Sequence, residues 1–424
     1  MSPFLEKLRL LNRKYAKAAV VVLRVLLGVV FIFSGFVKAD DLWGFIYKLE
    51  EYLSVLDMTL PRTVTLTIGM TVAAVEALCG LSLLIGAYRR VVPVIMGLMM
   101  AVMLPLTAWL YFANPISDCG CFGDAIILSN GATFLKNILI TIGVIYLIKY
   151  NKYVRLRLFH PELHWLVVMG GMAYMAALSL TCYNVQPVID FRPYPEESNL
   201  IKDIESDGSE VEFLYTKDGE EKVFTADNLP DETWTYVDRI PSETNSENEG
   251  LAVYDGDEEV SQDVIASSGK QMIYVVPEMN RIDLSYTYFV NELYRKCLEN
   301  DIDFIALLAT DTEGIEWWKD YSMANYACYS ADDTELKSLV RGKMSIVYTE
   351  DGIIKWKRTI SSLVDTYHDN KATGTFPDNI VFDLQHYFYK ITIIFAAWLI
   401  FIGIIQILIQ VKTKKQKNDR IHKR

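Results

Sequence analysis

The sequence predicts an α-helical membrane bundle of six spans that carries one α/β domain outside the membrane. Long apolar runs fill the first 185 residues and return near the C-terminus, whereas residues 186–386 have the composition of a soluble domain. Charge divides the same way: residues 186–386 hold 42 acidic and 17 basic residues, a net charge of −25, and the rest of the chain carries +13. The acidic domain has no basic patch, which excludes nucleic acid as a partner.

Six segments are apolar enough to cross a bilayer, whose hydrocarbon core requires roughly 20 apolar residues in a helix. These segments are Ala18–Val37, Val64–Tyr88, Val91–Phe112, Phe134–Ile148, Leu163–Tyr183 and Ile391–Val411. The fourth segment is short and contains Lys136, so its helix is expected to begin near Gly131.

Basic residues gather before the first span, between the second and third, between the fourth and fifth, and after the last. The positive-inside rule places all four clusters in the cytoplasm, together with both termini. Residues 186–386 are then periplasmic. We expect a multi-pass protein of the bacterial cytoplasmic (inner) membrane, for which the lipid bilayer is one partner.

Two charged residues lie within predicted spans, Arg24 in the first and Glu76 in the second. A charge at that depth costs several kcal/mol unless it is paired or hydrated. The two helices run antiparallel, so an Arg24–Glu76 ion pair is one hypothesis. The alternative is that Arg24 extends to the headgroups and Glu76 is protonated or bonded to a neighbouring helix.

Six cysteines are present, and two of them form the sharpest motif, Cys119-Gly120-Cys121-Phe122-Gly123. The motif follows the third span and is therefore expected at the outer membrane face, where thiols are oxidised or exchange. A bridge across a single glycine is strained and easily reduced, which suits electron transfer. A structural clip and half of a metal site are the alternatives. No His or third Cys lies nearby in the sequence, so a metal is not expected.

Cys182 is predicted at the outer end of the fifth span, at the depth of the Cys119/Cys121 loop. It either exchanges with that pair or serves as packing at the interface. Cys79, Cys297 and Cys328 lie on apolar helix faces or in a strand, and packing is the expected role for each.

The first four spans resemble the DoxX/MauE group of small membrane proteins, over about residues 15–150. The resemblance is carried by Arg24 with Gly28, by Ser34-Gly35-Phe36-Val37-Lys38, by Glu76 with Gly80 and Gly86, and by the Cys-Gly-Cys-Phe-Gly loop. It implies a four-helix thiol oxidoreductase. The MauE branch is linked to methylamine utilisation, where it is thought to help form disulfides in an exported dehydrogenase, and DoxX-type members are associated with quinone-linked sulfur oxidation.

The outer domain begins with a small β-rich segment that includes a hairpin, Val211–Tyr215 with Lys222–Thr225. From about Leu251 strands and helices alternate in the order β-α-β-α-β-α-β-β, which resembles a thioredoxin-like or peroxiredoxin-type domain. Two features of such enzymes are missing. Residues 277–283, after the first core strand, contain no Cys-x-x-Cys, and Gly342-Lys343-Met344 contains no proline before the final hairpin.

The sequence therefore divides into a four-helix DoxX/MauE-like module (1–150), a fifth span (151–185), a β-rich segment (186–250), a thioredoxin-like domain (251–386), and a sixth span with a basic tail (387–424). One hypothesis is a thiol redox protein in which Cys119 and Cys121 accept electrons from a periplasmic thiol client. A quinone near Arg24 and Glu76 then reoxidises them. The alternative is a non-catalytic membrane scaffold whose outer domain binds periplasmic partner proteins.

Overall fold

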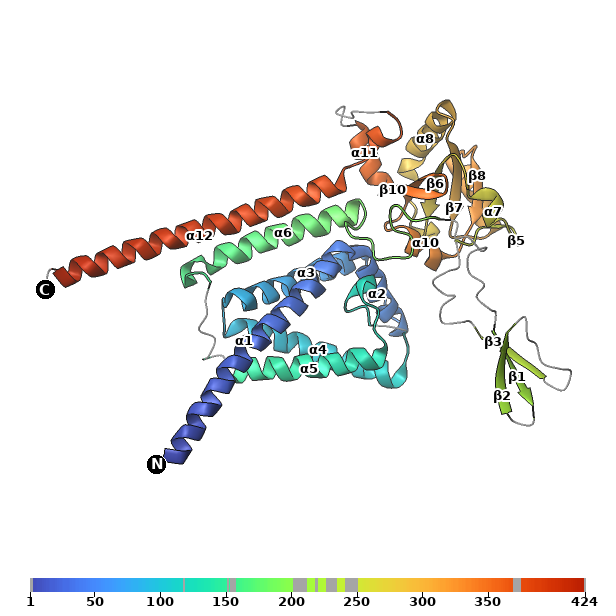
Figure 1. The fold of residues 1–424 in the computed structure, drawn as a ribbon. Helices are drawn as coiled ribbons and strands as arrows, with labels where there is room; N and C mark the ends of the chain where they lie inside the picture. The colour runs from blue at the N-terminus through green and yellow to red at the C-terminus, as the bar shows by residue number, and fades with distance from the viewer. Residues whose placement is uncertain are drawn as a thin grey trace. The chain divides into compact units, whose positions relative to one another are not determined.

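A computed structural model divides the 424-residue chain into two compact units (Figure 1). The membrane unit comprises residues 1–189 and 382–424, and the α/β unit comprises residues 190–381. The structure describes residues 3–116, 119–150, 152, 158–200, 212–217, 220–225, 235–240, 251–368 and 375–422. Within these ranges it describes side chains from residue 15 to residue 412, except in the strands between 212 and 240.

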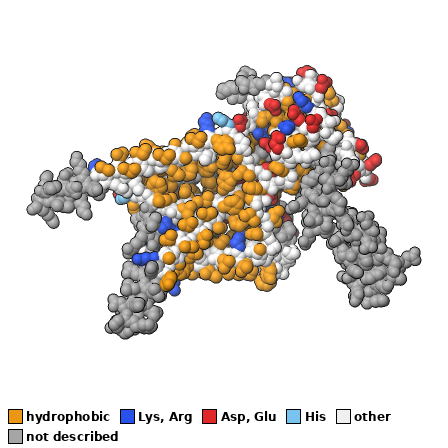
Figure 2. All heavy atoms as spheres, in the orientation of Figure 1, with side chains coloured by type: hydrophobic (Ala, Val, Ile, Leu, Met, Phe, Trp, Pro, Cys, Tyr) orange, Lys and Arg blue, Asp and Glu red, His pale blue; other side chains and the backbone are white. Residues whose placement is uncertain are grey.

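All six predicted spans are helices that are long and apolar enough to cross a membrane. The helices of the unit are α1 (Pro3–Asp40), α2 (Leu42–Val55), α3 (Arg62–Ile85), α4 (Val91–Ala113), α5 (Asn130–Tyr150), α6 (His164–Asn184) and α12 (Leu384–His422). Many of their apolar side chains remain exposed, and hydrophobic atoms dominate the face of this unit seen in Figure 2. A surface of this kind is stable against lipid tails, and the chain is a multi-pass membrane protein.

Glycines allow α1 and α3 to approach each other closely. A Cβ atom on Gly35 would lie 2.5 Å from the carbonyl oxygen of Ala73, and one on Gly80 would lie 2.6 Å from the carbonyl oxygen of Gly28. Small residues at such crossings bring two helix backbones together in lipid. The polar side chains on α1 and α3 therefore face one another at short range.

The α/β unit contains a seven-stranded mixed sheet in the order β10-β9-β6-β7-β8-β4-β5. Its strands are β4 (Tyr254–Asp255), β5 (Glu258–Glu259), β6 (Lys270–Val276), β7 (Asp303–Leu308), β8 (Ala327–Ser330), β9 (Ser345–Glu350) and β10 (Ile353–Thr359). Strands β6, β7 and β8 are parallel, whereas β9 runs antiparallel to β6 and forms a hairpin with β10. The predicted order of strands and helices after residue 270 is confirmed.

Alternate side chains of the central strands enter two separate cores, as the period of a strand requires. On one face Met272 and Tyr274 pack with α8 (Thr287–Glu299), α9 (Thr312–Ser322) and α11 (Ile360–His368). On the other face the core includes Ile273, Val275 and side chains from α10 (Asp333–Leu339). The sequence analysis did not predict α11, β4, β5 or the short helix α7 (Ser261–Val264).

A separate three-stranded sheet, in the order β2-β1-β3, is also present. It consists of β1 (Glu212–Lys217), β2 (Glu220–Thr225) and β3 (Thr235–Ile240). The predicted hairpin is confirmed as β1 and β2. The sequence also predicts a turn near Asp218-Gly219 for this hairpin, and a Ser/Asn/Glu-rich loop over residues 241–250. Both lie outside the described residues.

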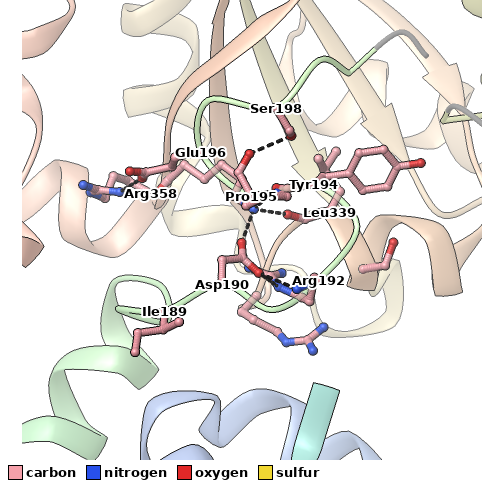
Figure 3. Close-up of polar contacts among 12 residues, drawn as sticks. Ile189, Asp190, Arg192, Tyr194, Pro195, Glu196, Ser198, Leu339 and Arg358 are labelled. Carbon is pink, nitrogen blue, oxygen red and sulfur yellow. Dashed lines mark hydrogen bonds and ion pairs between the residues drawn. The ribbon is translucent and has the colours of Figure 1, made fainter. Parts of the chain in front are cut away.

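Residues 190–200, the linker segment, run along β10 and are held by buried charges (Figure 3). Lys357 Nζ donates to Asp190 Oδ2 at 2.5 Å, to the Leu339 carbonyl at 3.0 Å and to the Tyr194 carbonyl, and Arg192 binds both carboxylate oxygens of Asp190 at 2.7 and 2.8 Å. Burial opposes the ionisation of Asp190, but the charges of Arg192 and Lys357 outweigh it and hold the pKa of Asp190 below its ordinary value. The cluster fixes the start of the α/β unit to its sheet.

Candidate thiol site

The cysteine motif lies in the loop that joins α4 to α5, and polar contacts shape this loop. Asn130 Nδ2 donates to the Ile116 carbonyl and to Asn114 Oδ1, both at 2.8 Å, which closes the base of the loop. The tip is a turn in which the Gly123 N–H donates to the Gly120 carbonyl at 3.1 Å. Gly120 has a φ of +66°, a left-handed conformation that glycine adopts without strain.

The turn brings the two thiols into contact, with 2.7 Å between Cys119 Sγ and Cys121 Sγ. A disulfide bond measures about 2.05 Å, so a small movement joins the sulfurs. Cys119 is buried, at 7% exposure, and packs with Leu110 and Ile116. Tyr52 on α2 donates its hydroxyl to the Cys119 carbonyl at 3.0 Å. Cys121 is half-buried and is the more accessible member of the pair.

A buried ion pair holds the backbone of Cys121. Lys38 Nζ donates to Glu76 Oε2 at 2.9 Å, and the side chains are only 1% and 7% exposed. The same ammonium donates to the Cys121 carbonyl at 2.7 Å and to Ser34 Oγ at 2.7 Å. The Ser34 hydroxyl in turn donates to the Cys121 carbonyl at 3.0 Å. Lys38 and Ser34 of α1 therefore bind the loop at the peptide group that follows Cys121, and Glu76 of α3 holds Lys38 in place.

A second cation approaches the loop from α5. Lys136 Nζ lies 4.1 Å from the centroid of the Phe122 ring, a distance typical of a cation–π contact. Phe122 also packs against Phe33 of α1, with 5.6 Å between ring centroids. The residue directly after Cys121 is therefore anchored on two helices. This contact also gives a partner to the lysine that made the fourth span look marginal.

These surroundings make the two thiols unequal. Contact with the Cys119 thiol, followed by the charges of Lys136 and Lys38, lowers the pKa of Cys121 to about 6, although burial and Glu76 oppose the shift. The pKa of Cys119 is raised well above its ordinary value, first by contact with Cys121 and then by burial. At neutral pH the pair therefore holds its negative charge on Cys121, which suits that sulfur to act as nucleophile and leaving group.

The predicted Arg24–Glu76 ion pair is wrong. Arg24 is buried, at 5% exposure, and donates to the carbonyls of Leu83 and Leu84, both at 3.1 Å. These carbonyls belong to the last turn of α3, where the helix dipole attracts cations, and the Leu83 carbonyl also accepts from the Gly86 N–H at 3.3 Å. Arg24 therefore binds the C-terminal end of α3 and is not paired with Glu76. Glu76 binds Lys38 instead.

Cys182 occupies a different cluster from the thiol pair. It is 2% exposed, lies among Met175, Leu178 and Val185, and its thiol donates to Asp40 Oδ1 at 3.6 Å. Asp40 also accepts from the backbone N–H groups of Val188 and Ile189, so this contact belongs to the end of α6. Cys79, Cys297 and Cys328 are buried in apolar cores, as predicted.

Sequence reasoning missed the roles of Lys38, Ser34, Tyr52 and Lys136. A signal existed for the first two, since Ser34 and Lys38 are four residues apart on one face of α1, near the depth expected for the cysteine loop. Lys136 also offered a signal, because a lysine in a marginal span needs a partner. Among the described residues, no group of three or more His, Cys, Asp or Glu side chains could hold a metal ion.

Two parts of the chain match models of known protein families. Residues 209–242, which contain the three-stranded sheet, match a family model described as a domain of unknown function, DUF8463. No curated protein and no solved structure matches the chain. Residues 16–150, which contain α3, α4, α5, most of α1 and the thiol loop, match the family model described as methylamine utilisation protein MauE. This membrane module is therefore similar to MauE.

Proposed function

We propose that the protein is a thiol–disulfide oxidoreductase of the bacterial cytoplasmic membrane that oxidises thiols of exported proteins. The observation that carries this proposal is the contact between Cys119 and Cys121, held by buried charges at one end of the helix bundle. Residues 16–150 match the family model of the methylamine utilisation protein MauE. The resemblance carried by the sequence motifs implies a part in disulfide formation in an exported enzyme, which supports the proposal. We further propose that the client, the protein whose thiols are oxidised, is an exported protein.

The orientation follows from basic residues at the ends of the spans. With both termini in the cytoplasm, Arg89, Arg90, Lys149 and Lys152 are cytoplasmic. The thiol loop and the α/β unit are then periplasmic, on the side where exported thiols are oxidised. The proposed division keeps a four-helix redox module over residues 1–150, with the fifth and sixth spans anchoring the outer domain.

The reaction begins with the disulfide form. A client thiolate attacks Cys121 Sγ, the more accessible sulfur, and the Cys119–Cys121 bond breaks, so that Cys119 leaves and takes up a proton. A second client thiolate then attacks the client sulfur of the mixed disulfide and releases Cys121 as a thiolate. The client loses two electrons and two thiol protons to become a disulfide, and the protein gains the two electrons as a dithiol.

Return to the disulfide requires a two-electron acceptor, for which we propose a membrane quinone. An apolar hollow of about 630 Å³ between α6 and α12 has the size and polarity for an isoprenoid quinone. Tyr174 lines it, with its hydroxyl 3.3 Å from Thr392 Oγ1, and Trp398 and Phe395 offer flat apolar surfaces. When bound, a quinone supplies the capacity to accept two electrons and two protons.

We propose that the α/β unit has a thioredoxin-like fold without thiol chemistry. The strand order β8-β7-β6-β9-β10, with the last two antiparallel, supports the fold. The turn after β6 carries Met279–Arg281 and no cysteine. Burial raises the pKa of Cys297 to about 12 and that of Cys328 to about 11, so both thiols are unreactive at neutral pH.

Trapping of thiols in intact cells tests the proposed function. Acid quenching followed by a maleimide of high mass should show Cys119 and Cys121 as a disulfide that becomes a dithiol when a reductant is added. A C119A variant cannot form the Cys119–Cys121 disulfide and should leave client thiols reduced, and a C297A variant should behave like wild type. Permanently reduced Cys119 and Cys121 in growing cells would overturn the proposal.

The missing Cys-x-x-Cys favours a second candidate function, in which the α/β unit docks a periplasmic partner and the membrane unit serves as its anchor. A C119S/C121S double variant separates the two functions. If it still recovers the same stable partners by affinity purification and supports the same phenotype in cells, the docking function is sufficient. If it loses the phenotype while it keeps the partners, the thiol chemistry is required.

A further inference from the structure

We propose that Lys38, fixed by Glu76 and Ser34, is a positioning residue that sets the charge at the sulfur of Cys121. This inference rests on the proposed thiol chemistry and adds to it a specific origin for the reactivity of one sulfur. It concerns residues that lie in the first two membrane spans, distant in sequence from the cysteine loop.

The position of Lys38 is over-determined. Its side chain is 1% exposed and its ammonium meets acceptors on three elements: Ser34 on α1, Glu76 on α3 and the carbonyl of Cys121 in the loop. An ammonium has three protons to donate, and these three short contacts use all of them. Lys38 therefore cannot turn away from the loop without leaving buried acceptors unpaired, which costs about 1–3 kcal/mol for each.

Glu76 explains how a lysine can be buried in a membrane span. An ionised side chain in a helix centre costs about 2.5–3.5 kcal/mol on insertion scales unless it has a partner. Glu76 supplies the opposite charge at 2.9 Å, and the close approach of α1 and α3 at Gly35 brings the two side chains together. In this ion pair the Lys38 ammonium is the group that faces the thiol loop, where it binds the Cys121 carbonyl.

The charged and titratable groups around the loop come from every element packed against it. They are Lys38 on α1, Lys48, Glu51 and Tyr52 on α2, Glu76 on α3, Cys119 and Asp124 in the loop, and Lys136 on α5. Of these, Lys38 both donates to the Cys121 peptide group and lowers the pKa of the Cys121 thiol. Lys136 contributes charge through its place over Phe122, and Lys48 is paired with Glu51 at 2.8 Å.

The consequence for the reaction is directional. A positive charge near Cys121 stabilises its thiolate, which is the group released in the second exchange step. Stabilising the reduced form makes the disulfide a stronger oxidant of client thiols. The membrane pair Lys38–Glu76 therefore biases the site towards accepting electrons from a client.

The test compares lysine variants that all retain a hydrogen-bond donor. In a C119A background, the rate at which Cys121 reacts with iodoacetamide is measured against pH in the purified full-length protein, with the site identified by mass spectrometry. A K38Q variant keeps a hydrogen-bond donor but removes the cation, and should move the midpoint upward by about one pH unit. An E76Q variant removes the opposing anion and should move the midpoint downward. K38R keeps the charge and should leave the midpoint in place.

Two further lysine variants show how large a shift of the Cys121 midpoint the loss of one cation produces. K136Q removes the other cation and should also raise the midpoint, whereas K48Q removes a cation already paired on α2 and should leave it unchanged. With Cys119 restored, K38Q should shift the equilibrium with glutathione towards the disulfide by up to about tenfold, the value of one pKa unit. If K38Q does not fold, the double variant K38Q/E76Q serves, with a smaller shift in the same direction because loss of Glu76 partly offsets loss of Lys38.

A folded K38Q protein whose Cys121 midpoint does not move overturns the inference and leaves Lys38 with a structural role only. That failure is distinct from failure of the proposed function. The latter would appear as wild-type cysteines that never cycle in cells, whatever the pH profile of Cys121.

Discussion

The membrane unit and the α/β unit both contain cysteines, but they give those cysteines opposite surroundings. In the membrane unit Cys121 is half-buried, touches a second thiol and lies near two lysines. In the α/β unit Cys297 is fully buried, with the sulfur of Met272 at 3.6 Å. The α/β unit, for which we propose a thioredoxin-like fold, has buried thiols, and the membrane unit holds the pair for which we propose reactivity. Local charge and access, more than fold, determine what a cysteine can do.

Buried lysines show a second contrast between the units. Lys38 and Lys357 are each about 1–2% exposed in the side chain and each is paired with a carboxylate. Lys357 gathers Asp190 and two backbone carbonyls, so its contacts fasten the linker segment to the sheet. Lys38 adds a contact to the backbone of a cysteine. A buried lysine–carboxylate pair is therefore structural in the α/β unit, whereas in the membrane unit it contacts the backbone of the proposed thiol site.

The largest expected effect comes from removal of Cys121. The C121S variant should lose all ability to oxidise a dithiol peptide in a single-turnover assay, because no disulfide can form. Variants C297A and C328A should retain wild-type turnover, since these thiols are buried in the core of the α/β unit. Activity that survives in C121S, or disappears in C297A, would reverse the comparison between the units.

Reaction with iodoacetamide should separate the same cysteines by orders of magnitude at neutral pH. The thiolate is the reactive form, so the rate at Cys121 should rise as pH increases through about 6 and then level off. The rate at Cys297 should continue to rise towards pH 12. Mass spectrometry of the folded, reduced protein follows both sites in one sample, and equal rates at neutral pH would contradict the assigned surroundings.

Breaking the charge cluster of the linker segment should destabilise the α/β unit. The D190A variant leaves Lys357 and Arg192 buried without their carboxylate, which costs about 3–5 kcal/mol. Urea unfolding of the full chain in detergent, followed by the fluorescence of Trp318 and Trp356, measures the loss.

The matched control for D190A is E197A, which removes an exposed ion pair with Lys355 and should have no measurable effect. The pH dependence has a defined sign. Because the folded state lowers the pKa of Asp190, its stabilisation is present above the ordinary value of about 3.9 and is lost as pH falls through the folded value. Stability that is equal for D190A and wild type at neutral pH would show that the cluster does not hold the unit together.

The smallest expected effect comes from adding one methyl group at the contact between α1 and α3. In G80A the new Cβ would meet the Gly28 carbonyl oxygen at 2.6 Å, which forces α1 and α3 apart and costs about 1–3 kcal/mol. The change should also weaken the Lys38–Glu76 pair and slow alkylation of Cys121 at neutral pH. G403A is the control, because nothing lies within 4 Å of its Cβ position. Equal thermal stability of both variants would contradict the close approach.

Much of the architecture could be predicted because it depends on periodic signals. Long apolar runs located the six helices, and short apolar runs separated by helical patterns located the buried strands β6, β7 and β9. The linker segment was not predicted as part of the sheet, because Asp190-Phe191-Arg192-Pro193-Tyr194-Pro195 has no period and proline removes backbone donors. Its attachment depends on charges that come from β10, far along the chain.

The sequence predicted the two cysteines of the candidate site but not the side chains that contact their loop. The motif around Gly120 located the thiols, but the sequence gives only the depth of a residue along a helix, not the direction in which it points. Arg24 and Glu76 have compatible depths, yet Arg24 turns to the end of α3 while Glu76 turns to Lys38. Close packing at Gly28, Gly35 and Gly80 decides that direction, and packing is a property of the pair of helices.

Arg24 and Lys38 also bear on how the chain enters the membrane during synthesis. Both cations lie on α1, and their partners, the last carbonyls of α3 and the carboxylate of Glu76, lie on the next span. An α1 helix released into lipid by itself would hold two unpaired charges, Arg24 within the span and Lys38 in its last turn, and a charge near a helix centre costs about 2.5–3.5 kcal/mol. The two helices gain most by leaving the translocon together, as a preassembled hairpin whose interior polar bonds are already formed.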